Sequence, residues 1–177
     1  MYKNKIWFFD NIINLDLQEK IKDLFLSNNF PWYFIPDVTN QKNQQQRPAL
    51  QHYFVDEKNF TSQHIDLIKP IIDNSCNKIN FKYKHIERVK SFLQFSLNLK
   101  DYSVDFPHID SNQNHLVVLY YVLTAYGNTL IYDRDNKTIL RSITPKQGSV
   151  VIFDGSYFHT AEQPKQGNRC IINCNLT

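Results

Sequence analysis

Residues 107–123 read PHIDSNQNHLVVLYYVL, and this stretch contains the two signals on which the interpretation of the chain depends. His108 and Asp110 are separated by one residue, where Pro107 and the Asn-rich turn that follows favour an extended chain. In an extended chain, residues i and i+2 point to the same face, so this imidazole and this carboxylate can reach a single ion. The run LVVLYYVL after the turn is β-branched and aromatic, which predicts a buried strand.

Short runs of the same character lie on both sides of this stretch and are separated by Gly, Pro, Asn or Asp. They read SFLQFSLNL before it, and NTLIYD, TILRSI, SVVIF and RCIINCNL after it. Residues 5–9 are a further short candidate strand. Six or more short strands at this spacing predict a sandwich or jelly roll with helices packed outside it. We therefore expect a mainly β protein with flanking helices, in the α+β class.

The helices are expected in the first half of the chain. Either Asn14 or Asp16 is a suitable cap for a helix that ends near residues 28–29, because apolar residues recur at helical spacing between them. A second helical pattern covers residues 60–77 and contains Pro70, which should kink or split the helix. The polar, Gln-rich stretch at residues 36–48 is predicted to be a mobile loop.

The composition excludes several classes of protein. The 177 residues are 42% hydrophobic and 21% charged, which is typical of a globular chain and not of a disordered one. The longest apolar run has about ten residues, whereas a membrane-spanning helix needs roughly 20. Asp10 interrupts the N-terminal stretch before a secretion signal is complete. The three cysteines form no CxxC pair, so we expect reduced thiols and a cytoplasmic location.

A third candidate metal ligand lies far along the chain. His159 follows Asp110 by 49 residues, directly after the predicted strand SVVIF and a short turn. Two histidines and one carboxylate on one face of an octahedral ion leave three open positions, the arrangement found in non-haem Fe(II) oxygenases. The triplet HID also occurs at residues 64–66, but there the helical pattern turns residues i and i+2 about 200° apart. We therefore do not expect His64 to bind the metal.

Arg169 is the candidate anion-binding residue. It lies ten residues after His159 and starts the predicted strand RCIINCNL. A guanidinium stays charged when buried and can hold a carboxylate through two parallel hydrogen bonds. Ile171 and Asn173 would share its face of the strand, so Asn173 is also expected to face the site.

The segments PHID, HLVVLYYVL, GNT, TPKQGSVVIFDGSYFHTAEQP and NRCIIN together resemble the Fe(II)- and 2-oxoglutarate-dependent dioxygenases, most closely the prolyl-4-hydroxylase-like branch with its small microbial and phage members. The resemblance covers residues 89–176 and implies a double-stranded β-helix core of the jelly-roll or cupin-like kind. It implies His108, Asp110 and His159 as the catalytic iron ligands and Arg169 as the salt-bridge partner of 2-oxoglutarate. The cofactors implied are Fe(II), 2-oxoglutarate and O2, with ascorbate as an additional reductant.

The resemblance also suggests residues that contact 2-oxoglutarate. Gly127, Asn128 and Thr129 match a Gly-x-Thr turn in which the Thr contacts the co-substrate. Of the adjacent tyrosines 120 and 121, the alignment favours Tyr121 as the one that faces inward. Prolyl hydroxylases place a Tyr nine or ten residues before the first metal-binding His, and here Asn98 stands in that region as its replacement. They often have Lys where this chain has Arg169.

The predicted function is a dioxygenase that hydroxylates a peptide side chain such as proline, a free amino acid or another small metabolite, with succinate and CO2 as co-products. We expect one domain, in which residues 1–88 form helical support and a lid (residues 31–48) and residues 89–177 form the metal core. Two alternatives remain open: a non-catalytic jelly-roll binding module, and a metal cupin that does not use 2-oxoglutarate. Arg169 distinguishes the second alternative from the main prediction.

The partners expected are a peptide or a small molecule, without a membrane, and the oligomeric state is left open. Nucleic acid is not expected, because the net charge is only +3 and nothing cationic follows Arg169 on its strand. A local basic cluster is predicted to form a solvent-exposed face, and its members are Lys82, Lys84, His85, Arg88 and Lys90.

Overall fold

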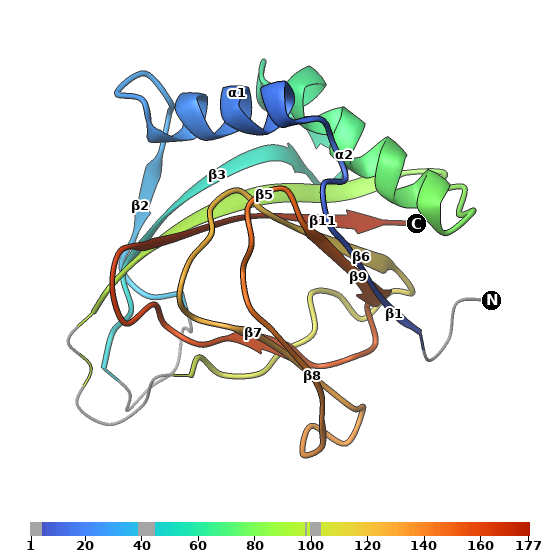
Figure 1. The fold of residues 1–177 in the computed structure, drawn as a ribbon. Coiled ribbons are helices and arrows are strands. Elements are labelled where there is room, and N and C mark those ends of the chain that lie inside the picture. Colours follow the sequence, from blue (N-terminus) through green and yellow to red (C-terminus); the bar gives the residue numbers. More distant parts are fainter. Residues whose placement is uncertain (1–4, 39–44, 98, 100–103) are drawn as a thin grey trace.

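The computed structural model describes residues 5–38, 45–97, 99 and 104–177, in which two helices and a small sheet pack on opposite sides of a large sheet (Figure 1). The elements in chain order are β1 (Ile6–Phe9), α1 (Leu15–Leu26), β2 (Tyr33–Ile35), β3 (Ala49–Asp56), β4 (Asn59–Phe60), α2 (Ile65–Lys78), β5 (Ile86–Phe95), β6 (Leu116–Tyr121), β7 (Thr129–Tyr132), β8 (Ile139–Ile143), β9 (Val150–Asp154), β10 (His159–Ala161) and β11 (Asn168–Leu176). The prediction of a mainly β protein with flanking helices is confirmed.

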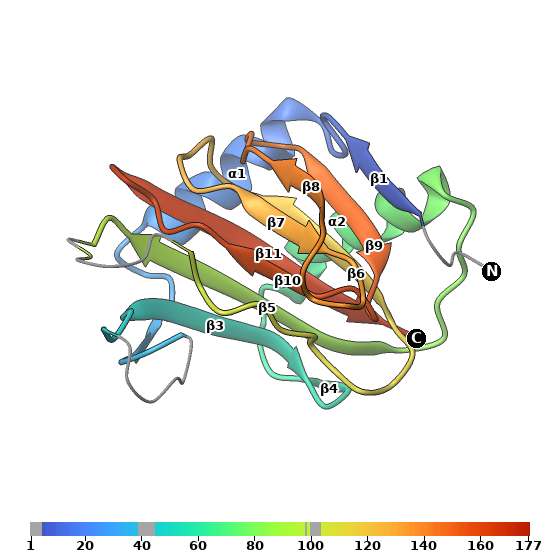
Figure 2. The ribbon, with the colours of Figure 1, turned by 90° about the horizontal axis from the view of Figure 1, so that it is seen from below.

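The strands form two antiparallel sheets. The large sheet has the order β1-β9-β6-β11-β5-β3-β2, with β4 paired to β3, and the small sheet has the order β10-β7-β8. Figure 2 views the molecule from the side of the small sheet, so that the helices lie behind the large sheet. The strands that carry the C-terminal half of the predicted pattern are therefore neighbours in space, although their connections cross between the sheets.

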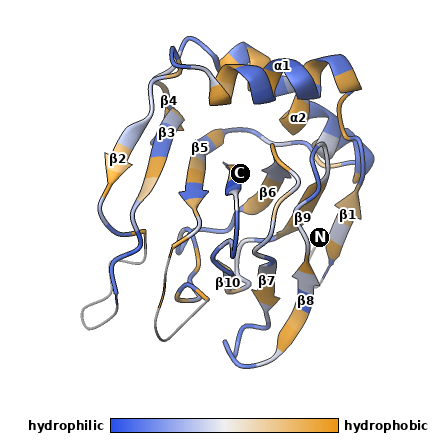
Figure 3. Cartoon of the chain, turned by 60° about the vertical axis from the view of Figure 1, so that its left-hand side comes forward, coloured by the Kyte–Doolittle hydropathy of each residue, from blue (hydrophilic) through white to orange (hydrophobic). Residues whose placement is uncertain are grey.

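Alternation along the strands divides the interior into two apolar clusters. On β11, Cys170, Ile172 and Cys174 pack into the cluster beneath the helices, whereas Ile171 packs into a second cluster between the two sheets. Figure 3 shows hydrophilic and hydrophobic segments in turn along β3 and β5, as expected for strands that face two different environments. The three cysteines of the chain are all free.

Helix α1 begins and ends close to the predicted positions, whereas α2 begins at Ile65, later than the predicted start at Phe60. Asn14, and not Asp16, caps α1: its side-chain oxygen accepts a hydrogen bond of 2.9 Å from the backbone N–H of Leu17. Of the two effects expected at Pro70, a split does not occur, since α2 runs without interruption from Ile65 to Lys78. Proline removes one backbone donor from this helix, and burial of its apolar face against the sheet outweighs that loss. Neither helix is long and apolar enough to cross a membrane within the described chain.

The first half of the chain contributes more strands than the sequence predicted. Strand β3 lies between β2 and β5 in the large sheet, with Leu50 opposite Leu93 and His52 opposite Ser91. Phe60, expected at the start of a helix, pairs with Val55 of β3 instead. The predicted loop at residues 36–48 falls partly on residues 39–44, which lie outside the described residues. The helices therefore support a sheet that the first half of the chain itself extends.

Candidate active site

The two histidines of the predicted metal site are held together by backbone hydrogen bonds. The N–H of His108 donates to the carbonyl oxygen of His159 at 3.0 Å, and the N–H of His159 donates back at 2.9 Å. This isolated bridge joins the extended segment before β6 to the first residue of β10. The centres of the two imidazole rings are 4.7 Å apart as a result.

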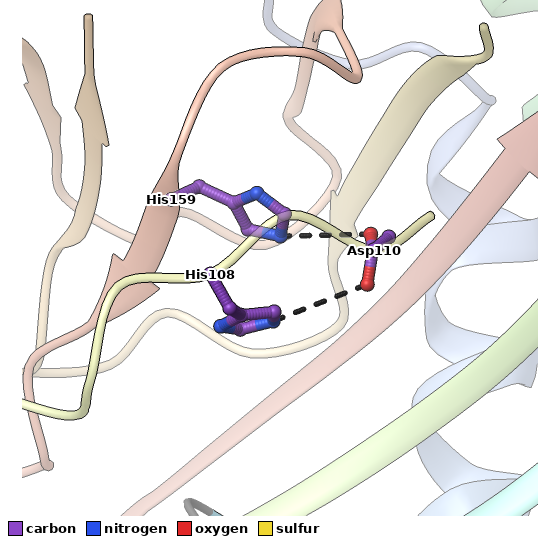
Figure 4. A group of neighbouring side chains, drawn as sticks. All are labelled: His108, Asp110 and His159. Carbon is purple, nitrogen blue, oxygen red and sulfur yellow. Dashed lines mark ion pairs between the residues drawn. The ribbon is translucent and has the colours of Figure 1, made fainter. Parts of the chain in front are cut away.

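Asp110 completes a group of three potential metal ligands. Its Oδ2 lies 3.5 Å from Nε2 of His159, and its Oδ1 lies 3.9 Å from Nε2 of His108. One ligand atom from each residue lies within 4.8 Å of the others, and the three side chains point toward one another (Figure 4). Two imidazole nitrogens and a carboxylate oxygen in one small volume are a donor set that suits Fe(II). The structure thus brings together the three residues that the sequence selected.

The protonation states of these side chains also suit a metal ligand. Burial by itself would raise the pKa of the Asp110 carboxyl, but the neighbouring side chains of His159 and Arg88 outweigh burial and hold this pKa well below its usual range. Burial lowers the pKa of His159 to about 4, although the carboxylate of Asp110 opposes this shift. Near neutral pH the pair is therefore a carboxylate and an uncharged imidazole, the forms that bind a metal ion.

Two further side chains hold the carboxylate of Asp110 from outside the group of three. Arg88 on β5 donates from Nη2 to Oδ1 at 2.7 Å, and Asn173 on β11 donates from Nδ2 to Oδ2 at 2.9 Å. Contacts of this kind fix the orientation of a ligand and tune its affinity for the metal. The prediction that Asn173 faces the site is therefore in line with its position, whereas the prediction of a solvent-exposed face is wrong for Arg88.

Arg169 lies buried at the far end of the same cavity. Its Nε donates to the carbonyl oxygen of Gly127 at 3.0 Å, its Nη1 to Oε1 of Gln94 at 2.8 Å, and its Nη2 to Oγ1 of Thr129 at 2.8 Å. Within the described chain these uncharged partners use three of the five N–H groups of the guanidinium. Two N–H groups on the outer nitrogens remain for the carboxylate of a ligand.

Tyr121 contacts the cavity-lining residue Thr129 and does not line the cavity itself. Its hydroxyl donates to Oγ1 of Thr129 at 2.9 Å, so that this oxygen accepts from both Tyr121 and Arg169. The cavity is lined by Thr129, whereas Tyr121 is not among its lining residues. The inward orientation of Tyr121 agrees with the prediction, and its contact with the site passes through Thr129. Asn98, the other residue predicted to contact 2-oxoglutarate, lies outside the described residues.

One cavity of about 330 Å³ connects the three potential metal ligands to Arg169. Its walls come from β5, β6, β7, β10 and β11 together with the segment before β6. Leu119, Phe92 and Ile171 form an apolar part of the wall between the two charged ends. A volume at the lower end of the usual range for ligand pockets fits one or two small organic molecules.

The sequence missed a polar network beside Arg169. Gln94 accepts from Arg169 and donates from Nε2 to Oδ2 of Asp105 at 3.2 Å. Oδ1 of Asp105 in turn accepts from Nη1 of Arg47 at 2.5 Å, so that an ion pair closes this end of the cavity. Counting alternate residues along β5 from Phe92 would have found Gln94, because it shares the cavity face of that strand. Asp105 had no comparable signal in the sequence.

His64 and His115 lie away from the potential metal ligands, as expected for His64. His64 lies at the start of α2, where its ring is 5.8 Å from the ring of Phe30. His115 precedes β6, and a side chain at Gly155 would collide with it. Neither belongs to the group of three potential metal ligands found among the described residues.

No protein-family model and no curated protein sequence matches the chain. Three solved structures illustrate what it resembles. An oxidoreductase of the 2OG-Fe(II) oxygenase family from Burkholderia pseudomallei has a TM-score of 0.77 at 11% identity, covering 99% of this chain and 86% of that one. A prolyl hydroxylase from Trichoplax adhaerens, in complex with a hypoxia inducible factor peptide fragment, has a TM-score of 0.69 at 14% identity, covering 98% and 84%.

The third structure is the viral collagen prolyl hydroxylase of Paramecium Bursaria Chlorella virus-1 in its 2OG complex. It has a TM-score of 0.64 at 14% identity, covering 99% of this chain and 98% of that one. At such identities the likeness shows the fold. The chain therefore has the double-stranded β-helix fold of the 2-oxoglutarate- and Fe(II)-dependent oxygenases, as the sequence predicted.

Proposed function

We propose that the chain forms one oxygenase domain that uses Fe(II), 2-oxoglutarate and O2 to hydroxylate a peptide side chain or a small molecule. One observation carries this proposal: a group of two histidines and one carboxylate shares a cavity with a buried arginine that has uncharged partners. A structural jelly roll has no need of either feature, and a metal cupin that does without 2-oxoglutarate has no need of the arginine.

In this proposal His108, Asp110 and His159 hold the metal. Arg88 and Asn173 each hydrogen-bond one oxygen of Asp110, which keeps that carboxylate oriented toward the two imidazoles. When bound, Fe(II) and 2-oxoglutarate consume O2, yield succinate and CO2, and make one oxygen atom available to hydroxylate a substrate C–H bond. The protein would hold the three ligand side chains in place beside a cavity that can admit the co-substrate and the substrate.

Arg169 would hold the carboxylate of 2-oxoglutarate that lies far from the metal. Its guanidinium is kept in place by Gln94, Thr129 and the carbonyl oxygen of Gly127, so it needs little reorganisation to bind. Oγ1 of Thr129 accepts hydrogen bonds from both Tyr121 and Arg169. The O–H group of Thr129 therefore remains available to donate to the same carboxylate of 2-oxoglutarate. The apolar wall between the two ends excludes water and strengthens these interactions.

The proposed substrates are a peptide or a small molecule. The neighbour from Trichoplax adhaerens carries a peptide in its structure, which supports a peptide as one kind of partner. The cavity is also suited to a free amino acid or another small metabolite. Three free, buried cysteines support a reducing compartment such as the cytoplasm, where ascorbate would help to keep the iron reduced.

Turnover of 2-oxoglutarate tests this proposal. Purified protein is incubated with Fe(II), ascorbate and 2-oxoglutarate in air, and succinate is measured with and without a mixture of peptides and amino acids. We expect succinate to form, and to disappear in His159→Ala. Conversion at an equal rate in His159→Ala, or no conversion by the wild-type protein under any of these conditions, would contradict the proposed activity.

A further inference from the structure

Strand β5 presents a row of four side chains to the cavity: Arg88, Lys90, Phe92 and Gln94. In the register with β11 they lie opposite Asn175, Asn173, Ile171 and Arg169, in that order. The two ends of the row are already occupied, since Arg88 contacts Asp110 and Gln94 contacts Arg169. Lys90 and Phe92 lie in the middle, between the potential metal ligands and the proposed co-substrate site.

The ammonium group of Lys90 has no counter-charge in this row. Among the described residues, no carboxylate lies within 4.0 Å of its Nζ, which instead lies 4.6 Å from the centre of the Phe92 ring. Burial lowers the pKa of Lys90 to about 8, and the charge of Arg88 adds to this shift, whereas Asp110 and Asp56 oppose it. A half-buried cation that lines a cavity without an acidic partner is a place where an anion can bind.

The other charges of the cavity have partners. Arg88 pairs with Asp110 at 2.7 Å, and Asp105 pairs with Arg47 at 2.5 Å. Arg169 is the residue to which the proposed function assigns the far carboxylate of 2-oxoglutarate. With Arg88 paired to Asp110 and Arg47 to Asp105, the bound metal ion, Arg169 and Lys90 would together carry four positive charges, and 2-oxoglutarate would supply two negative charges. Two positive charges would therefore remain in the loaded cavity, where Lys90 has no carboxylate of its own.

We propose that Lys90 and Phe92 form the substrate subsite, and that the substrate is a small carboxylic acid whose carboxylate pairs with Lys90 while its apolar part packs on the Phe92 ring. This inference rests on the proposed function and narrows its substrate class. It favours a free amino acid or a related small acid over an uncharged prolyl peptide. Hydroxylation of such an acid would consume O2 and 2-oxoglutarate and yield the hydroxy acid, succinate and CO2.

The position of the subsite suits this role. Lys90 lies opposite Asn173 in the sheet, and the amide of Asn173 donates to Asp110. An anion bound at Lys90 would therefore lie next to the potential metal ligands. The co-substrate would span from the metal to Arg169 along β11, which leaves the β5 side of the cavity for the substrate. A cavity of about 330 Å³ that must also hold 2-oxoglutarate leaves room for a small acid.

Binding to the Fe(II)- and 2-oxoglutarate-loaded protein, kept free of oxygen, tests the inference. The probes are free L-amino acids and simple aliphatic and aromatic carboxylic acids, each paired with its uncharged primary amide. Affinity is measured by calorimetry and by the change that each probe causes in the visible charge-transfer band. We expect at least one acid to bind about 10-fold or more tightly than its amide, as for hydrogen bonds to charged groups.

Lysine variants then identify the residue responsible. Lys90→Gln should weaken binding of that acid about 10-fold or more and leave the amide unchanged, whereas Lys90→Arg should keep the preference for the acid. Lys20→Gln removes the same charge from the exposed surface of α1 and should have no effect. The affinity for 2-oxoglutarate should change little in all three variants.

Three results would overturn the inference. The first is a panel in which no acid binds better than its amide, including a panel in which neither form binds. The second is an unchanged acid preference in Lys90→Gln, and the third is a loss of 2-oxoglutarate affinity in that variant as large as the loss for the acid, since Lys90 would then serve the co-substrate. A wild-type protein that gives no charge-transfer band with Fe(II) and 2-oxoglutarate would instead remove the proposed function itself.

Discussion

The large sheet has a helix-covered face and a cavity face, and strand β11 contributes alternate residues to both. Cys170, Ile172 and Cys174 are buried in the apolar cluster beneath α1 and α2. Arg169 and Asn173, on the opposite face of the same strand, hydrogen-bond Thr129 and Asp110 in the cavity. The period of two along a strand therefore separates stability from ligand binding at the level of single residues.

The two faces of the sheet should respond differently to substitutions. A change on the helix-covered face should lower the free energy of unfolding and leave the ligand affinities of the folded protein intact. A change on the cavity face should lower the ligand affinity and leave the free energy of unfolding nearly unchanged, where the side chain makes few packing contacts. Four substitutions test the two halves of this expectation, in order of decreasing effect.

His108→Ala should have the largest effect on ligand binding. The side chain of His108 is 55% exposed, so its removal costs little packing, but it takes away one of three metal ligands. The affinity for Fe(II), measured by calorimetry without oxygen, should fall by more than the ~10–100-fold typical of losing an outer contact. The free energy of unfolding of the metal-free protein, measured by urea denaturation, should change by less than about 0.5 kcal/mol. Metal affinity within a few fold of wild type would break the comparison at this site.

Ile172→Ala should have the largest effect on stability. Ile172 is fully buried beneath the helices, so truncation leaves a cavity and should lower the free energy of unfolding by about 2–5 kcal/mol. The conservative change Ile172→Val should cost about 0.5–1.5 kcal/mol. Below the unfolding transition, metal affinity should match that of the wild-type protein, and a parallel loss of metal affinity would show that the two faces are not independent.

Arg169→Ala should weaken 2-oxoglutarate binding by about 10–100-fold, because it removes the charged donors from one end of the cavity. Arg169→Lys keeps the charge but loses the paired hydrogen-bond geometry. Its affinity for 2-oxoglutarate should therefore lie between those of the wild-type protein and Arg169→Ala. Calorimetric titration of the Fe(II)-loaded protein measures this change, with the fraction of folded protein checked by circular dichroism. Loss of Fe(II) with unchanged 2-oxoglutarate affinity would show that the two roles are reversed.

Lys90 should produce the smallest effect, in the pH dependence of stability. Its pKa is about 8 in the folded protein and near 10.5 in the unfolded chain, so the unfolded chain binds more protons between these values. The free energy of unfolding of the metal-free protein should therefore rise with pH across this window, relative to Lys90→Gln. Identical slopes for the two proteins would mean that Asp110 and Asp56 fully offset the effects of burial and of Arg88 on the pKa of Lys90.

The sequence predicted the strands of the second half other than β10 (His159–Ala161), because each of the predicted strands carries its apolar signal locally. Asn14 and its helix were predictable for the same reason, since a cap and an apolar stripe are close together along the chain. His108 and Asp110 could be selected because one residue separates them. The predicted strands between Asp110 and His159 indicated that a β fold could bring His159 back to these two residues.

Strand β3 escaped prediction because its buried residues are partly polar. His52 is buried, but its ring nitrogens contact the carbonyl oxygen of Pro31 at 2.9 Å and Oγ of Ser62 at 2.8 Å. A histidine satisfied in this way packs like an apolar residue while it interrupts the apolar pattern. No local rule identifies partners that lie 10 and 21 residues away.

The basic cluster was misread for a related reason. Arg88 and Lys90 stand among other basic residues, which indicates a solvent-exposed face when only neighbours in the sequence are considered. In the fold, Arg88 pairs with Asp110, which lies 22 residues away, and Lys90 lines the same cavity. The alternation of β5 places both on the cavity face, so the starting residue of that strand was the missing information.

The most direct test of the central claim is the visible charge-transfer band that forms when Fe(II) and 2-oxoglutarate bind together at one metal centre. Purified protein is titrated with both in the absence of oxygen, alongside His108→Ala and Arg169→Ala. We predict a band in the wild-type protein, no band in His108→Ala, and a band in Arg169→Ala only at higher 2-oxoglutarate concentration. No band in the wild-type protein, or an equal band in His108→Ala, would contradict the assignment of this cavity as an Fe(II)- and 2-oxoglutarate-binding site.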